Sequence, residues 1–66
     1  MSIQDLTPAE RRTLERYIET GSRKIVAAEF GRCMQTIDEQ LRSAREKAGV
    51  RTSMQLAVAY GRWTAQ

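Results

Sequence analysis

Three glycines divide the chain into short segments and constrain its fold more than any other feature. Gly21, Gly31 and Gly49 each follow the last apolar residue of a stretch with helical periodicity. Glycine at such a position is typical of a helix end, because it adopts the left-handed conformation that closes the last turn. No stretch alternates apolar and polar residues with period two, so the pattern favours helices joined by tight turns.

Hydroxyl residues mark where these helices begin. Thr7 stands three residues before Glu10, and Thr52 stands three residues before Gln55, so each pair has the spacing of a capping box. Ser22 is a further cap, directly after the first glycine. The signals together predict an all-α fold of four helices, over residues 7–20, 22–31, 33–48 and 52–63.

The chain is long enough for one domain, which we assign to residues 1–66. Hydrophobic residues make up 41% and charged residues 29%, and this balance is typical of a globular protein. Cys33 is the only cysteine, which indicates a reducing compartment. The longest unbroken apolar run, residues 56–60, is too short for a membrane span or a signal peptide. We therefore expect a soluble, cytoplasmic protein that does not contact a membrane.

The joint between the second and third predicted helices is the most specific local pattern. Ala27, Gly31 and Ile37 have the spacing of a helix-turn-helix, in which the alanine permits close approach, the glycine turns and the isoleucine pins the next helix. A plain helical hairpin shares this triplet and remains an alternative. The third helix continues with one apolar stripe: Ile37, Leu41, Ala44 and Ala48.

Three longer motifs with fixed spacing extend over residues 6–60. L-T-x-x-E is matched by Leu6, Thr7 and Glu10, with Leu14 following. S-x-K-x-[IV]-A-x-x-[LF]-G is matched by Ser22, Lys24, Val26, Ala27, Phe30 and Gly31. T-[VI]-x-x-H-[VL]-x-x-[AI]-x-x-K-[LA]-G-V is matched by Thr36, Ile37, Leu41, Ala44, Lys47, Ala48, Gly49 and Val50, with Gln40 in place of the histidine. In these motifs the chain resembles the LuxR/GerE/FixJ type of bacterial DNA-binding domain.

The resemblance implies a four-helix LuxR/GerE-like helix-turn-helix domain of the winged-helix-like superfamily. Its third helix is expected in the major groove of double-stranded DNA, and its fourth helix in a dimer contact. The implied function is sequence-specific transcription regulation by a homodimer. Asp38, Glu39 and Arg42 stand at the positions that face base edges. The residues expected to contact the DNA backbone are Arg23, Lys24, Thr36, Arg45, Lys47 and Arg51.

The acidic residues at the front of the third helix leave two roles open. A carboxylate of Asp38 or Glu39 can accept a hydrogen bond from cytosine N4 and reject other bases, while Arg42 pairs with guanine. Alternatively, both carboxylates stabilise the first turns through the helix dipole and by pairing with Arg42 on the next turn. The two roles do not exclude each other.

The fourth helix is apolar around most of its circumference. One side is expected to cover the core and the other to meet a partner, although a wholly intramolecular role is the alternative. The expected partner contacts are Met54, Val58, Tyr60 and Trp63. The same helix supports a rival function, favoured by the acidic front of the third helix. In it, the chain is a small antagonist that forms heterodimers with larger LuxR-type regulators and blocks their DNA binding.

Residues that carry chemistry are scarce. The chain has no histidine, no glycine-rich phosphate loop and no paired metal ligands. We therefore expect no enzymatic activity, no metal or other cofactor and no small-molecule ligand. Cys33 lies beside Arg32 at a helix start, which favours a lowered pKa, but a buried turn cysteine is the expected state. The first helix is expected to carry a solvated, salt-bridged face formed by Glu10, Glu15 and Glu19.

Overall fold

Four α-helices and one short 3-10 helix make up residues 2–65, which are the part of the chain that the computed structural model describes. The elements are η1 (Ile3–Asp5), α1 (Pro8–Thr20), α2 (Arg23–Phe30), α3 (Met34–Ala48) and α4 (Ser53–Thr64). The predicted all-α class and the four predicted helices are confirmed, and this part of the chain contains no strand. The sequence does not predict η1, because three residues are too few to show a period. Within residues 2–65, no helix has the length and apolarity needed to cross a bilayer.

Both predicted capping boxes form. Thr7 Oγ1 accepts a hydrogen bond from the Glu10 amide at 3.1 Å, and Glu10 Oε1 accepts one from the Thr7 amide at 2.9 Å. Thr52 and Gln55 make the same reciprocal pair, at 3.0 and 3.3 Å. Cys33 occupies the corresponding place before α3 without a capping hydrogen bond from its side chain. The start of α3 therefore lacks the stabilisation that the other helix starts receive.

The turn between α2 and α3 depends on Gly31. Its φ of 64° lies in the left-handed region. The Arg32 amide donates to the Ala27 carbonyl at 3.0 Å, and the Gly31 amide donates to the Ala28 carbonyl at 3.4 Å. These two bonds satisfy carbonyls at the end of α2 and reverse the chain within a few residues. The same left-handed geometry closes α1 at Gly21 and α3 at Gly49.

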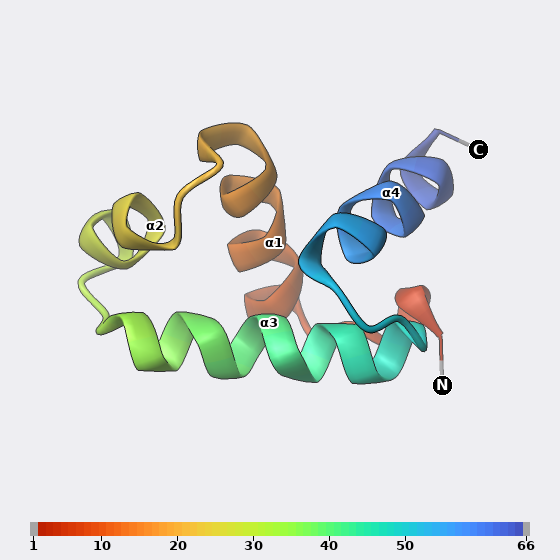
Figure 1. The fold of residues 1–66 in the computed structure, drawn as a ribbon, viewed down its shortest axis with the longest axis horizontal. Coiled ribbons are helices and arrows are strands. Elements are labelled where there is room, and N and C mark those ends of the chain that lie inside the picture. Colours follow the sequence, from red (N-terminus) through yellow and green to blue (C-terminus); the bar gives the residue numbers. More distant parts are fainter. Residues whose placement is uncertain (1, 66) are drawn as a thin grey trace.

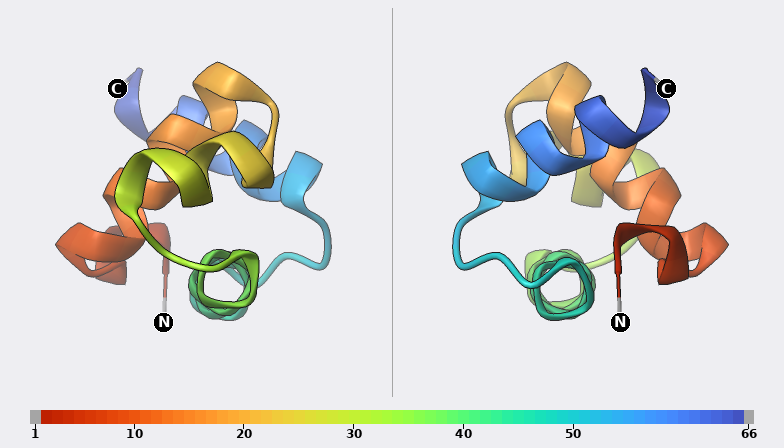
Figure 2. Two further views of the ribbon diagram at one scale, coloured as in Figure 1. Left: turned by 90° about the vertical axis from the view of Figure 1, so that its left-hand side faces the viewer. Right: turned by 90° about the vertical axis from the view of Figure 1, so that its right-hand side faces the viewer.

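All the other helices lie on one side of α3. Figure 1 shows α3 along one edge of the molecule, and Figure 2 shows it nearly end-on with α1, α2 and α4 on the same side of it. Ile37, Leu41 and Ala44 of its predicted stripe are buried, whereas Ala48, in its last turn, is only partly buried. The rest of the core consists of Leu6, Leu14, Val26, Ala27, Leu56 and Tyr60. Because the core covers one face of α3, the opposite face is left to solvent.

Tyr60 belongs to this core, which corrects its prediction as a partner contact. Its side chain is 5% exposed, and its hydroxyl donates to Glu15 Oε2 at 2.6 Å. Burial and this hydrogen bond raise the pKa of Tyr60 to about 12. The Trp63 ring lies 5.7 Å from the Tyr60 ring, and the Arg11 guanidinium lies 5.0 Å from the Trp63 centroid. Tyr60 and Trp63 therefore pack α4 against α1 and complete the core of this small domain.

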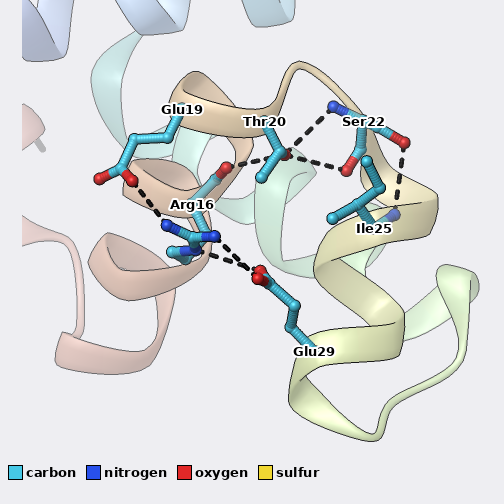
Figure 3. Close-up of polar contacts among 6 residues, drawn as sticks. All are labelled: Arg16, Glu19, Thr20, Ser22, Ile25 and Glu29. Atoms are coloured by element: carbon cyan, nitrogen blue, oxygen red, sulfur yellow. Dashed lines mark hydrogen bonds and ion pairs between the residues drawn. The ribbon is translucent and has the colours of Figure 1, made fainter.

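Polar side chains hold α2 against α1. The Arg16 guanidinium donates to both carboxylate oxygens of Glu29, at 3.1 and 2.8 Å, and to Glu19 at 2.6 Å (Figure 3). The hydrogen bonds that Arg16 donates to Glu29 raise the pKa of Arg16. In the α1–α2 turn, the Thr20 hydroxyl donates to the Arg16 carbonyl at 2.8 Å, and Ser22 Oγ caps α2 by accepting from the Ile25 amide at 3.3 Å. These contacts set the direction in which α2 leaves α1.

Glu10 is buried, so its prediction as part of a solvated face is wrong. The Glu10 side chain folds back to the start of α1 to form the capping box. Lys47, near the end of α3, contacts it there. Lys47 Nζ lies 2.7 Å from Glu10 Oε1, and Glu10 is 7% exposed. Burial alone would raise the pKa of Glu10, but hydrogen bonds from Lys47, Ser43 and the Thr7 amide outweigh it and lower the pKa to about 2.

The stability of the domain should depend on pH through Glu10. Its pKa is about 2 in the folded chain against an ordinary value of 4.5, so its contribution is present above pH 4.5 and is lost as the pH falls toward 2. That contribution is roughly 3 kcal/mol. Glu10→Gln keeps the capping acceptor but loses the charge. Thermal unfolding between pH 7 and pH 2 should therefore show a smaller pH dependence for this variant. Exposed Glu19→Gln is the control, and the prediction is wrong if all three chains respond equally to acid.

Gly31 in the α2–α3 turn should stabilise the domain through its backbone conformation alone. A Cβ at Gly31 would meet nothing within 4 Å, so Gly31→Ala tests only the left-handed backbone and should lower the free energy of unfolding by about 1 kcal/mol. Gly61 has equal space but lies inside α4 without a positive φ. Gly61→Ala should raise the unfolding free energy by about 0.5 to 1 kcal/mol. Urea unfolding measures both, and changes of the same sign would contradict the assignment.

Candidate nucleic-acid interface

The outward face of α3 is polar and open to solvent. Arg42 and Glu46 are 75% and 69% exposed, and Arg42 Nε lies 3.4 Å from Glu46 Oε1. One turn earlier, Gln35 Nε2 donates to Glu39 Oε1 at 3.4 Å, and both residues are exposed. Amide, guanidinium and carboxylate groups therefore follow one another along the face. Such groups can donate to and accept from the edges of bases.

Asp38 pairs with α2 and not with its own helix. Its Oδ1 lies 2.6 Å from Arg23 Nη1, and the two side chains are 44% and 49% exposed. The predicted pairing of Asp38 or Glu39 with Arg42 is therefore wrong. Arg42 turns to Glu46 instead. The physical reason is that the first turn of α2 brings Arg23, fifteen residues earlier in the chain, beside the front of α3.

One groove collects the three predicted base-reading residues. Asp38, Glu39 and Arg42 line it together with two of the predicted phosphate contacts, Arg23 and Arg45. Tyr17 of α1 and Ser53 of α4 complete its walls. Arg45 Nη1 donates to Ser53 Oγ at 3.2 Å, so it is held at the α4 side. The groove therefore spans the flank of α3 between the beginnings of α2 and α4.

The remaining predicted phosphate contacts lie outside this groove. Lys24 is exposed in the first turn of α2 and lines a neighbouring hollow with Arg23. Thr36 lies in the first turn of α3, where its hydroxyl is 3.3 Å from Cys33 Sγ. Lys47 is bound to Glu10, and Arg51 lines a separate groove along α4. The structure thus brings together only part of the predicted set.

Internal ion pairs reduce the positive charge of this surface. Arg23 and Lys47 each have a carboxylate at 2.6 and 2.7 Å, whereas among residues 2–65 no carboxylate lies within ion-pair distance of Lys24, Arg45 or Arg51. The partners of Arg23 and Lys47 are 15 and 37 residues away along the chain. Only neighbours three or four residues apart on a helix can be read from sequence spacing. The sequence therefore overstates the charge that is free to meet a polyanion.

Cys33 is exposed, which corrects its prediction as a buried turn residue. Residues 31–35 are all exposed, from the turn through the first residues of α3, so no core forms around the thiol. A hydrogen bond with the Thr36 hydroxyl, together with backbone amides at the start of α3, lowers the pKa of Cys33. The predicted direction of the pKa shift is therefore confirmed, but its main cause is Thr36 and the helix start.

Only some of the residues predicted to contact a partner from α4 are exposed. Met54 is 78% exposed and Val58 is 49% exposed, whereas Tyr60 is in the core and Trp63 is half-buried against it. Met54 and Val58 line a groove with residues of the α3–α4 connection. The exposed apolar surface of α4 is therefore smaller than its sequence suggests, and it is centred on these two side chains.

Comparison of the chain with protein families, with curated proteins and with solved structures finds no match. The structure defines its class as a small all-α domain of four helices.

The pair between Arg23 and Asp38 should contribute little to stability. Both side chains are about half exposed, so solvent screens the pair and a coupling energy of about 0.5 kcal/mol is expected. A double-mutant cycle with Arg23→Ala and Asp38→Ala measures it by urea unfolding. The coupling should decrease further in high salt. A coupling of several kcal/mol that resists salt would show that the pair is a structural clamp.

Proposed function

We propose that the domain binds double-stranded DNA through α3, as a transcription regulator of the LuxR/GerE helix-turn-helix type. The observation that carries the proposal is the position of α3. It buries one face against all the other α-helices and leaves the opposite face, with Gln35, Glu39 and Arg42, open along its length. A helix of 15 residues is about 22 Å long and fits into a major groove.

The α2–α3 turn supports the proposal in a second way. In this type of domain, the helix before the recognition helix crosses the DNA backbone. Here α2 begins with Arg23 and Lys24, and Gly31 holds it at a fixed angle to α3. Lys24 is exposed and its ammonium is available to a phosphate, and Arg45 lies farther along α3. Cations near both ends of α3 are thus disposed to flank a groove.

Within this proposal, Glu39 and Arg42 are the main base-reading residues. Arg42 is the most exposed guanidinium of the face, and its ion pair with Glu46 is long, at 3.4 Å. Asp38 has a different role, because its carboxylate already accepts from Arg23. A phosphate that approached the start of α2 would compete with Asp38 for the Arg23 guanidinium. Asp38 would then be free to accept from a base.

A second function is favoured by the internal ion pairs and the exposed side chains of α4. Arg23 and Lys47 are neutralised inside the domain, and Met54 and Val58 are uncovered. A protein-binding antagonist of larger regulators of the same type needs such a contact surface and needs no affinity for DNA. Duplex binding by the purified domain decides between the two functions.

Selection from a random duplex pool should enrich a defined sequence, and two substitutions should then act differently on it. Arg42→Ala should remove roughly 1–3 kcal/mol of preference for guanine at one position. Lys24→Ala should weaken binding to all duplexes alike and reduce the slope of log affinity against log salt by about one unit. Arg62→Ala removes the same charge from α4, away from the outward face of α3, and should leave both quantities unchanged.

The proposal is contradicted if no sequence is enriched while the domain is folded by circular dichroism. It is also contradicted if all three substitutions reduce affinity equally. That result would describe a diffuse attraction between a basic chain and a polyanion, without a reading helix.

A further inference from the structure

A groove along α4 combines an apolar floor with a cation at each end. Its apolar lining comes mainly from Val50, Met54 and Val58, and Arg51 and Arg62 are also among its lining residues. Met54 and Val58 are two of the most exposed large apolar side chains in residues 2–65. Met54, Val58 and Arg62 recur four positions apart and so lie on one side of α4, whereas Arg51 lies in the connection before its Thr52 cap. The two arginines therefore border the groove at the beginning and near the end of α4.

The arginines of this groove lack acidic neighbours. Glu46 is the last acidic residue of the sequence, so α4 and the segments on both sides of it carry no carboxylate side chain. Among the residues that the structure describes, neither Arg51 nor Arg62 forms an ion pair. An occupant that brings carboxylates to both ends would therefore be attracted by both arginines.

A second copy of α4 does not meet this requirement. If two copies packed along each other in antiparallel directions, Arg51 of one would lie beside Arg62 of the other. If they packed in parallel, each arginine would lie beside the same arginine of the second chain. Like charges would meet in both arrangements, and α4 has no acid to relieve them. Only a steep crossing at Met54 and Val58 separates the arginines, and it buries little surface.

We propose that the α4 groove binds an amphipathic helix of a partner protein that carries acidic residues at both ends of its apolar face. The acids would stand at the two ends of this face, about three helical turns apart, so that one meets Arg51 before α4 and the other meets Arg62 in its last turn. Two apolar residues between them, on the same face, would cover Met54 and Val58. The apolar floor favours a protein helix over nucleic acid, whose backbone offers it no apolar surface. The proposal does not depend on DNA binding by α3.

A pair of labelled helical peptides tests this binding by fluorescence anisotropy at low salt. Both carry two leucines between charged positions eleven apart; the charges are glutamates in one peptide and lysines in the other. The glutamate peptide should bind at least tenfold more tightly than the lysine peptide. Arg51→Glu combined with Arg62→Glu should weaken it about tenfold and should strengthen binding of the lysine peptide. Arg12→Glu combined with Arg32→Glu is the control with the same change of net charge, because neither residue lines the α4 groove.

Three results would overturn the proposal. The first is equal binding of both peptides, and the second is binding of neither by the folded domain. The third is self-association in sedimentation equilibrium that excludes the glutamate peptide and that Met54→Ser abolishes. A second copy of the chain would then occupy the groove. The duplex measurements are independent of the peptide measurements. A failure to bind DNA therefore does not contradict the peptide proposal, and a failure to bind peptide does not contradict the DNA proposal. A fall in duplex affinity in the Arg51→Glu/Arg62→Glu variant, without peptide binding, would assign the arginines to DNA instead.

Discussion

The burial of the inward stripe of α3 is the interaction on which the rest of the domain depends. Ile37 and Leu41 are almost fully enclosed, and they meet core residues from the three other helices. Ala44 is small and buried, which permits close approach of the neighbouring helices. A chain of 66 residues has a modest core and few contacts to spare. A shift of α3 would therefore disrupt its packing against all three other α-helices at once.

The sequence predicts the local structure well because its signals act over short distances. Thr7 with Glu10 and Thr52 with Gln55 begin helices by the hydrogen bonds that their spacing implies. Gly31 ends α2 because it accepts a backbone conformation that other residues avoid. Each of these signals requires residues within one turn of each other, so no knowledge of the tertiary structure is needed.

The candidate site is less predictable because its side chains choose partners across the fold. Asp38 could reach Arg42 on its own helix, but Arg23 competes successfully from the start of α2. The sequence predicts Glu10 on a solvated face and Tyr60 in a partner contact, yet the packing of the helices buries both. Periodicity identifies the faces of helices. It does not say which of two nearby carboxylates an arginine will meet, because that depends on the angles between helices.

The internal ion pairs differ in how readily they exchange partners. The pair of Arg23 and Asp38 is half exposed, so a competing anion can replace the carboxylate at little cost. The pair of Lys47 and Glu10 is much less exposed and also belongs to a helix cap, so opening it would leave a desolvated carboxylate without its cation. An anion can therefore recruit Arg23 but not Lys47. Arg23 can therefore take part in binding an anion, whereas Lys47 stabilises the fold.

The absence of carboxylates from the chain after Glu46 gives the domain a permanent electrical asymmetry. Lys47, Arg51 and Arg62 account for the whole net charge of +3, because the other eight basic residues and the eight acidic residues cancel. The excess positive charge of the sequence therefore lies in its last part, from the end of α3 through α4. A polyanion that came near the domain would be attracted toward this part of the chain before any side chain made contact. The orientation of a first encounter would then depend on the C-terminal helix, whichever helix made the final contacts.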